Sequence, residues 1–499
     1  MRVAPGILLA CLLAARAGAE VRLPYLLADH MVIQRGLPVA VWGWAAPGET
    51  VTASFRGATR STRADELGRW SVTLPPGEAG GPFELTVEGG NRIVLCDVMV
   101  GDVWVAAGQS NMEWPLRWAS NAAAEMAAAR YPAVRLVRTM HRVSDHPLSN
   151  FAGQTWAVCS PQTVEHFSAA AYHFGRELHE RLGVPIGLIQ TAWGGTPAEA
   201  WTSLRALGGE PSLLPVFSEW AKLTAQHETN LLLLPRLRRE WEKTAARARS
   251  EGREPPPEPE LRRRPGGQWT PSGLFNAMVA PLTRFPIRGV IWYQGEANTA
   301  PERAPLYGRL FETLIRDWRR AWGQGDFPFL FVQLANFRAA PDSMWPEVRE
   351  AQRQALALAN TAMAVAIDIG EAGNIHPGNK REVGRRLALA ARAVAYGEPL
   401  AYSGPLLRQV TRENGALRAW FDHAGGGLKT SGGAVRGFEV AGSNGRFFAA
   451  RAEIDGATVA VSSEAVPRPE RLRYGWADNP DCNLFNAANL PASPFRWPE

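Results

Sequence analysis

Between residues 99 and 400, short apolar runs alternate with longer stretches of helical periodicity, and this alternation limits the possible folds more than any other feature of the sequence. The runs are V-G-D-V-W-V-A-A (100–107), I-G-L-I-Q-T-A (186–192), G-V-I-W-Y-Q (289–294), F-L-F-V-Q-L (329–334) and A-V-A-I-D-I (364–369). These runs are typical of buried strands, whereas the periodicity of 168–182 and 303–321 predicts helices. The pattern predicts an α/β fold, with a parallel sheet covered by helices on both faces.

Both ends of the chain have a different pattern. Residues 20–98 contain short alternating runs such as P-V-A-V-W-G-W and W-S-V-T-L, broken by glycine and proline. Residues 401–499 return to similar runs. We therefore expect accessory antiparallel β domains at both ends of an α/β domain at 99–400. Within that domain, 206–268 is a charged, proline-rich insertion, which we interpret as a solvated arm, with a substrate lid as the alternative.

Residues 1–19 resemble a signal peptide. Arg2 precedes an apolar stretch, and Ala17-Gly18-Ala19 offers a small-residue cleavage site. The segment L-L-A-C also resembles a lipoprotein signal, although the apolar stretch continues past Cys11. We expect an exported protein, periplasmic or extracellular. The cysteines that remain are Cys96, Cys159 and Cys482, which allow one disulfide at most.

Charge and motifs exclude several classes of partner. The formal net charge of +6 is spread along the chain, so it does not predict a nucleic-acid surface. The apolar stretch of the leader is too short to span a membrane. No spacing of cysteine or histidine predicts a metal site, and we expect no cofactor. The oligomeric state stays open.

The first apolar run ends on G-Q-S-N-M, where Ser110 has two interpretations. A serine after a strand is commonly a helix cap. It is also a candidate nucleophile, provided that a base and oxyanion donors lie nearby. Met112 replaces the last glycine of the G-x-S-x-G elbow, which argues against the α/β-hydrolase fold.

The next two strand ends carry potential hydrogen-bond donors. T-A-W-G-G-T-P places Gly194 and Gly195 where backbone N–H groups can face an anion, although the motif taken alone favours a tight strand-to-helix turn. W-Y-Q-G-E-A-N places Gln294 and Glu296 after another strand. The Gln294 amide is a candidate oxyanion donor, and the alternative is ordinary loop polarity.

His376 follows the last predicted strand. Asp368, Glu371 and Asn374 precede it closely, so it is a candidate base with orienting partners. In contrast, His173 and His179 lie on a helix-like stretch, and we interpret them as surface or core residues without a catalytic role. Together, the four strand ends supply a nucleophile, oxyanion donors and a base, which is a complete set for acyl transfer.

These motifs jointly resemble the sialate O-acetylesterase family, within the SGNH-type hydrolases. The motifs are G-Q-S-N-M, W-G-G-T-P-A-E-A-W, W-Y-Q-G-E-A-N and I-H-P-G-N-K, and the likeness extends to 272–282, 402–406 and 473–496. The resemblance implies an SGNH-hydrolase-like sheet with Ser110 as nucleophile and His376 as base. It also implies an oxyanion hole formed by the Ser110 N–H, Gly194 or Gly195, and Gln294.

The sequence departs from the family pattern at the third triad position. Similar proteins carry aspartate two or three residues before the histidine, whereas this chain has Asn374 and Gly373 there. We predict that Asn374 orients the imidazole; Glu371, Asp368 or a Ser–His dyad are the alternatives. We expect Glu296 to support neighbouring side chains rather than act as an acid.

The resemblance implies a secreted serine esterase that removes O-acetyl groups from carbohydrate. Sialic acid and acetylated xylan or another plant polysaccharide are the alternative substrates, and a non-catalytic carbohydrate-binding protein is the alternative of another class. Most tryptophans are expected in the core, with one or two against the sugar. Those beside the motifs are Trp104, Trp114, Trp118, Trp193, Trp201 and Trp292.

Overall fold

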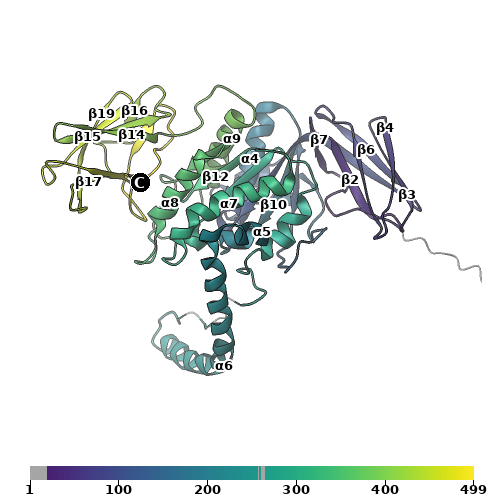
Figure 1. The fold of residues 1–499 in the computed structure, drawn as a ribbon, viewed down its shortest axis with the longest axis horizontal. Helices are drawn as coiled ribbons and strands as arrows, with labels where there is room; N and C mark the ends of the chain where they lie inside the picture. Colours follow the sequence, from purple (N-terminus) through teal and green to yellow (C-terminus); the bar gives the residue numbers. More distant parts are fainter. Residues whose placement is uncertain (1–19, 257, 260–263, 499) are drawn as a thin grey trace, which may run out of the picture.

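A central α/β body carries a β-rich region at each end and a long helical arm (Figure 1). This computed structural model describes residues 20–256, 258–259 and 264–498. The predicted leader, 1–19, lies outside the described residues. The predicted fold class is confirmed: a largely parallel sheet with helices on both faces, plus antiparallel β regions at the ends.

The sheet of the body has the strand order β13-β12-β11-β7-β10-β8-β9. All neighbours from β13 to β8 are parallel, and only β9 runs antiparallel to its neighbour β8. The strands are β7 (Arg92–Gly108), β8 (Tyr131–Arg138), β9 (Ala157–Cys159), β10 (Ile186–Ala192), β11 (Gly289–Tyr293), β12 (Phe329–Gln333) and β13 (Thr361–Val365). The chain passes from one side of β7 to the other between β10 and β11, and such a reversal opens a crevice at the carboxyl ends of the strands.

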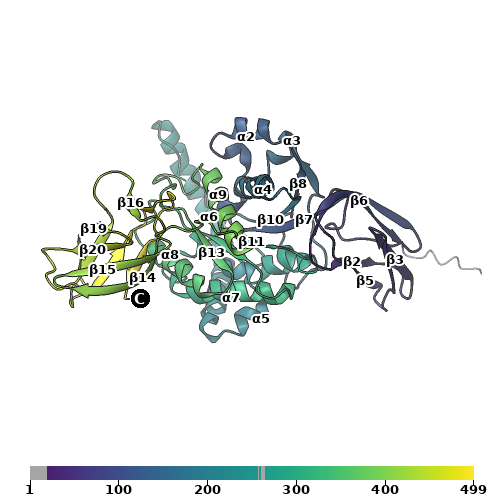
Figure 2. The ribbon, with the colours of Figure 1, turned by 90° about the horizontal axis from the view of Figure 1, so that it is seen from above.

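Helices cover the two faces of this sheet, with α4 and α9 on one side and α7 on the other (Figure 2). Gly384 of α9 lets α4 and α9 approach closely, because an added Cβ would lie 2.6 Å from the Cβ of His173. On the opposite face, Phe311 of α7 packs against Trp292 and Phe331 of the sheet. The helices are α1 (Ser110–Glu113), α2 (Ala122–Ala128), α3 (Pro161–Val164), α4 (Ala169–Leu182), α5 (Leu204–Gly208), α6 (Pro215–Ser250), α7 (Ala304–Trp322), α8 (Trp345–Gln354) and α9 (Lys380–Val394).

Strand β7 belongs to two regions at once. Its first half pairs antiparallel with β6 of the N-terminal β region, and its second half lies between β10 and β11. The expected boundary between residues 98 and 99 therefore falls inside one 17-residue strand. The other strands of this region are β1 (Val32–Gln34), β2 (Val39–Trp44), β3 (Thr50–Phe55), β4 (Ala58–Arg63), β5 (Arg69–Leu74) and β6 (Gly80–Glu88).

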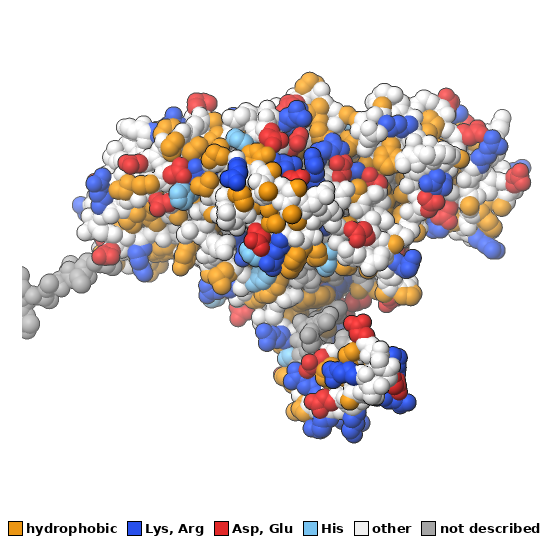
Figure 3. Space-filling view, turned by 180° about the vertical axis from the view of Figure 1, so that it is seen from behind, with side chains coloured by type: hydrophobic (Ala, Val, Ile, Leu, Met, Phe, Trp, Pro, Cys, Tyr) orange, Lys and Arg blue, Asp and Glu red, His pale blue; other side chains and the backbone are white. Residues whose placement is uncertain are grey.

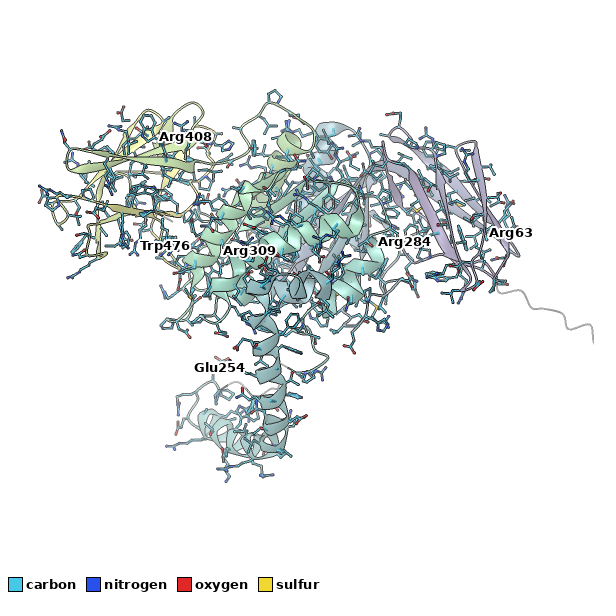
Figure 4. All side chains as sticks on the ribbon, in the orientation of Figure 1. Arg63, Glu254, Arg284, Arg309, Arg408 and Trp476 are labelled. Carbon is cyan, nitrogen blue, oxygen red and sulfur yellow. The ribbon has the colours of Figure 1, made fainter. Side chains whose placement is uncertain are left out.

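The C-terminal β region has a hydrophobic core of its own. Arg349 of α8 ties it to the body, because this fully buried guanidinium donates to the carbonyl oxygens of Ala477 and Asp478. Figure 4 shows the two β regions at opposite ends, marked by Arg63 and Arg408. The strands are β14 (Leu406–Glu413), β15 (Ala416–Asp422), β16 (Leu428–Thr430), β17 (Phe438–Ala441), β18 (Phe447–Ala449), β19 (Arg451–Asp455), β20 (Thr458–Ser462), β21 (Arg471–Tyr474), β22 (Leu484–Asn486) and β23 (Phe495–Trp497).

The insertion at 206–268 contains α6, a 36-residue helix with Pro235 inside it. The helix projects from the body, and its distal part carries side chains of both charges (Figures 1 and 3). Among the described helices, none is long and apolar enough to cross a membrane. Cys96, Cys159 and Cys482 are free thiols.

Candidate active site

Ser110 lies at the carboxyl end of β7, where the backbone turns sharply into α1. Gly108 has a φ of 138°, and a Cβ at this position would lie 2.1 Å from the carbonyl oxygen of Tyr293, so only glycine fits. Gln109 occupies the N-cap of α1, and Ser110 is the first helical residue. The serine is therefore not the helix cap that the alternative interpretation required.

The side chains of Ser110 and His376 are in hydrogen-bond contact. The Oγ of Ser110 lies 2.8 Å from the Nε2 of His376, although 266 positions separate the two residues. The indole of Trp114 stacks on the imidazole, with ring centroids 4.7 Å apart. Burial lowers the pKa of His376, and the nearby charge of Lys380 lowers it further. The imidazole is therefore biased toward its neutral, proton-accepting form.

Asn374 does not take the position predicted for it. Its Oδ1 accepts from the backbone N–H of His376 at 2.9 Å, and its Nδ2 donates to the carbonyl oxygen of His376 and to the Oε2 of Glu371. The expected hydrogen bond to the imidazole is replaced by bonds to the main chain, because the short side chain folds back on its own loop. Asn374 shapes this loop and does not orient the ring.

The two alternative acids are also engaged elsewhere. Glu371 accepts from the backbone N–H of Gly378 at 2.8 Å as well as from Asn374, and Asp368 forms a bidentate ion pair with Arg386. In the described parts of the chain, no side chain hydrogen-bonds to the Nδ1 of His376. The arrangement is a serine–histidine pair without a carboxylate behind the histidine.

Gly194 and Gly195 lie beside Ser110, but Gly194 is already engaged. Its N–H donates to the Oε2 of Glu113 at 2.6 Å, and the other oxygen of Glu113 lies 2.7 Å from the Nε2 of His141. The N–H of Gly195 has no acceptor among the described residues. Sequence reasoning missed Glu113 and His141; the position of Glu113, three residues after Ser110 in α1, was the available signal.

Gln294 does not present a free donor to the cavity beside Ser110. The residue is fully buried, and its Nε2 donates to the carbonyl oxygen of Thr196 at 3.2 Å and to the Oδ1 of Asn298 at 2.6 Å. Its Oε1 accepts from the hydroxyl of Tyr307. Both amide hydrogens are hydrogen-bonded inside the protein, so Gln294 stabilises the loop after β11.

Glu296 belongs to a buried polar chain behind the serine. Its Oε1 accepts from the Nδ2 of Asn111 at 2.6 Å, and the Oδ1 of Asn111 accepts from the Nζ of Lys380 at 2.7 Å. Lys380 also donates to the carbonyl oxygen of Pro377 next to His376. Burial raises the pKa of Glu296 and lowers the pKa of Lys380 to about 7. The chain connects the loops that carry Ser110 and His376.

Two cavities meet at the Ser110–His376 pair. The larger, of about 700 Å³, has a mostly apolar wall. Besides the pair, its lining includes Gln109, Gly194, Gly195, Trp269, Glu296, Pro301, Phe337 and Trp345. The smaller, of about 390 Å³, is lined also by Glu113, Trp114, Arg117, Trp118, Arg138 and His166. None of the described residues in 206–268 lines the larger cavity, although Gln268 donates to the carbonyl oxygen of Gly194.

The tryptophans beside the motifs divide into two groups. Trp104, Trp201 and Trp292 are fully buried. Trp114 and Trp118 line the smaller cavity, and Trp118 is 55% exposed. Trp193 stacks on His141. Across the described residues, no group of three or more histidine, cysteine, aspartate or glutamate side chains is placed to hold a metal ion.

Comparison with known proteins gives consistent matches. Residues 267–393 match the family described as carbohydrate esterase, sialic acid-specific acetylesterase. The chain is 33% identical to sialate O-acetylesterase of Mus musculus, over 81% of this chain and 80% of the mouse protein. It is 32% identical to the Homo sapiens protein of that name, over 82% and 79% of the two chains. The crystal structure of a carbohydrate acetylesterase from Xanthomonas citri superimposes with a TM-score of 0.82 at 40% identity, covering 96% of this chain and 99% of that one.

Proposed function

Because this chain belongs to the sialate O-acetylesterase family and is a carbohydrate O-acetylesterase, we propose that it cleaves sugar acetyl esters with Ser110 as nucleophile and His376 as base. The observation that carries the proposal is the 2.8 Å contact between the Oγ of Ser110 and the Nε2 of His376 at the meeting point of two cavities. A serine hydroxyl needs such a base to become a nucleophile.

The acylation step begins with attack of the Ser110 Oγ on the acetyl carbonyl carbon. The hydroxyl proton passes to the Nε2 of His376 as the new C–O bond forms, and the carbonyl electron pair moves onto the oxygen. When this intermediate collapses, the bond to the sugar oxygen breaks and that oxygen takes the proton from His376. The lowered pKa of His376 suits this role, because the ring must be neutral at the start.

Deacylation repeats these transfers with water. Water adds to the carbonyl carbon of acetyl-Ser110 while His376 accepts its proton. Collapse breaks the bond to the Oγ, which regains the proton, and acetate leaves. His376 thus acts as base and acid in each half of the cycle.

Backbone donors near Ser110 would hold the oxyanion. The N–H of Ser110, at the start of α1, and the N–H of Gly195 have no acceptors among the described residues, and both residues line the larger cavity. Such donors stabilise a developing charge well when they are fixed before the reaction. We propose Gly195 in preference to Gly194, whose N–H is bound to Glu113.

The smaller cavity is our proposed sugar site. The exposed indole of Trp118 offers a stacking surface for a pyranose ring, which acetylated xylan and sialic acid both contain. Arg138, half-buried on the same wall, donates to the carbonyl oxygen of His166 and forms no ion pair with a described residue, which favours a sugar that bears a carboxylate, such as sialic acid.

Acetate release from the two substrate classes tests the proposal. Purified protein is incubated with O-acetylated sialic acid or with acetylated xylan, and free acetate is quantified, with the Ser110→Ala variant as blank. Release from either substrate by the wild type alone supports the proposed mechanism, and the ratio assigns the substrate. Equal release by wild type and Ser110→Ala would contradict it.

We also propose that the protein acts outside the cytoplasm. The support for this is the composition of residues 1–19, with Arg2 before an apolar stretch and small residues at 17–19. Amino-terminal sequencing of protein recovered from the periplasm or medium tests it, and recovery of only the uncleaved cytoplasmic chain would contradict it.

A further inference from the structure

The proposed oxyanion site has backbone donors but lacks the side-chain donor that the sequence assigned to Gln294. Both hydrogens of the Gln294 amide are bound to Thr196 and Asn298. A different glutamine stands closer to the nucleophile. Gln109 precedes Ser110 directly and lines the same cavity as Ser110 and His376.

The orientation of the Gln109 amide is fixed by the loop after β11. Its Oε1 accepts from the backbone N–H of Gly295 at 3.3 Å and from the backbone N–H of Ala297 at 3.2 Å. A backbone N–H can only donate, so the atom that faces these two groups must be the oxygen. The NH₂ group is therefore the opposite end of the amide.

That NH₂ group is the end of the Gln109 amide that makes no hydrogen bond with the described residues. Gln109 is only 3% exposed, but its Nε2 is not fully enclosed by protein atoms. No described residue accepts a hydrogen bond from it. Gln109 lines the cavity that contains Ser110, in which an acetyl group would be attacked, and its NH₂ is the end of the amide that is left without an acceptor among the described residues.

The backbone of Gln109 is held as firmly as its side chain. Its N–H donates to the carbonyl oxygen of Tyr293 at 3.0 Å, and its own carbonyl oxygen accepts from the N–H groups of Met112 and Glu113. Gln109 occupies the N-cap of α1, yet its side chain makes no capping hydrogen bond. With its backbone and its amide oxygen both held, and its NH₂ group unpaired among the described residues, the side chain is organised before substrate arrives.

From this geometry we propose that Gln109 is a catalytic residue whose Nε2 donates a hydrogen bond to the acetyl oxygen. The assignment rests on the proposed Ser110–His376 mechanism. As the carbonyl becomes an oxyanion, the hydrogen bond becomes charge-assisted and therefore stronger. Gln109 then completes the oxyanion hole with the N–H groups of Ser110 and Gly195, in the role that the sequence gave to Gln294.

The Gln109→Glu variant tests the donor while keeping the acceptor. One carboxylate oxygen can still accept from Gly295 and Ala297, but the NH₂ is replaced by an oxygen. The carboxylate also adds a negative charge beside the developing oxyanion, so we expect kcat for p-nitrophenyl acetate to fall by at least roughly 10²- to 10³-fold, the usual loss for one oxyanion donor, with a small change in KM. Gln409→Glu, the same exchange at an exposed position of β14, is the control and should leave kcat unchanged.

A transition-state mimic separates catalysis from loop structure. A methylphosphonate ester that forms a tetrahedral adduct on Ser110 should react more slowly with Gln109→Glu by a similar factor. Affinity for the free sugar product should not change, because the sugar does not reach the oxyanion site. The assignment would be overturned if Gln109→Glu lost phosphonylation rate and affinity for the free sugar by the same factor. It would also be overturned if the kcat of Gln109→Glu were within threefold of the wild-type value.

If Gln109→Glu does not fold, the wild-type adduct decides the question. A crystal structure of phosphonylated Ser110 should place the phosphonyl oxygen about 3 Å from the Nε2 of Gln109. A phosphonyl oxygen directed away from Gln109 would overturn the proposal. Failure of Ser110 to form the adduct at all would instead refute the serine mechanism, so the two failures are distinguishable.

Discussion

Asn374 hydrogen-bonds to the main chain of His376 on both sides of that residue: its Oδ1 accepts from the N–H at 2.9 Å, and its Nδ2 donates to the carbonyl oxygen at 3.0 Å. These bonds fix the loop that presents the imidazole to Ser110. In this chain Asn374, two residues before the histidine, therefore determines the shape of the loop and does not place a negative charge beside the imidazole.

The Asn374→Asp variant should lower activity, even though it restores the residue that similar proteins carry. A carboxylate cannot donate to the carbonyl oxygen of His376, and it would face the carboxylate of Glu371. Losing such a bond costs about 1 kcal/mol or more, so we expect kcat/KM for p-nitrophenyl acetate to fall roughly fivefold. Asn374→Ser is a useful companion without added charge. A rise in kcat/KM of Asn374→Asp would show that the position acts on the ring.

The pH dependence of kcat/KM should have its acid limb below the ordinary histidine pKa of 6.5. Activity requires neutral His376, and the lowered pKa keeps the ring neutral to a lower pH. Lys380→Met removes the nearby positive charge, so the pKa of His376 should rise and the limb should move to higher pH. Lys222→Met, on exposed α6, is the control. An unmoved limb in Lys380→Met would contradict the electrostatic coupling.

Trp114 should contribute to kcat through its stacking on His376 rather than through a hydrogen bond from its indole N–H. Trp114→Phe keeps an aromatic face against the imidazole, so we expect kcat to fall less than threefold. Trp114→Ala removes the stack, which is worth about 1 kcal/mol and also holds the ring in place, so kcat should fall about tenfold or more. Trp420→Ala, in β15, controls for loss of an indole elsewhere. Equal losses in the two Trp114 variants would contradict this account.

His173 should make the fold sensitive to acid. Burial lowers its pKa from 6.5 to about 3, and neither ring nitrogen has a hydrogen-bond partner among the described residues. The unfolded chain therefore takes up a proton below pH 6.5 that the folded chain refuses, so stability is complete above pH 6.5 and falls as pH decreases toward 3.

The His173→Leu variant removes this proton linkage. Between pH 7 and pH 4.5, the free energy of unfolding of the wild type should fall by on the order of 2 kcal/mol more than that of the variant. Urea titrations at the two pH values measure the difference. Parallel losses in wild type and variant would show that His173 does not govern acid stability.

The sequence predicted most strands of the sheet, because buried parallel strands have a local signature, but the run at 364–369 overlaps β13 (Thr361–Val365) only at residues 364 and 365. The runs at or just before Ser110, Gly194 and Gln294 are strands β7, β10 and β11, and β7 lies between the other two in the sheet. It did not predict that β7 continues from the N-terminal β region, because a change of partner along one strand leaves its apolar pattern intact.

The directions of polar side chains at the strand ends were less predictable. The amide of Gln294 faces inward because Thr196, from a distant loop, and Asn298 offer it acceptors. The N–H of Gly194 is bound because α1 places Glu113 beside it. Both outcomes depend on contacts between separate segments, which the local pattern does not contain.

Trapping of the acetyl-enzyme tests the central claim most directly. Wild-type protein is mixed with p-nitrophenyl acetate, quenched in acid within milliseconds and digested, and the peptides are analysed by mass spectrometry. We predict that one acetyl group is found on Ser110, that it disappears at longer times, and that it is absent from the corresponding peptide of Ser110→Ala. Turnover by Ser110→Ala at the wild-type rate, or an acetyl group that accumulates on another residue, would contradict the account.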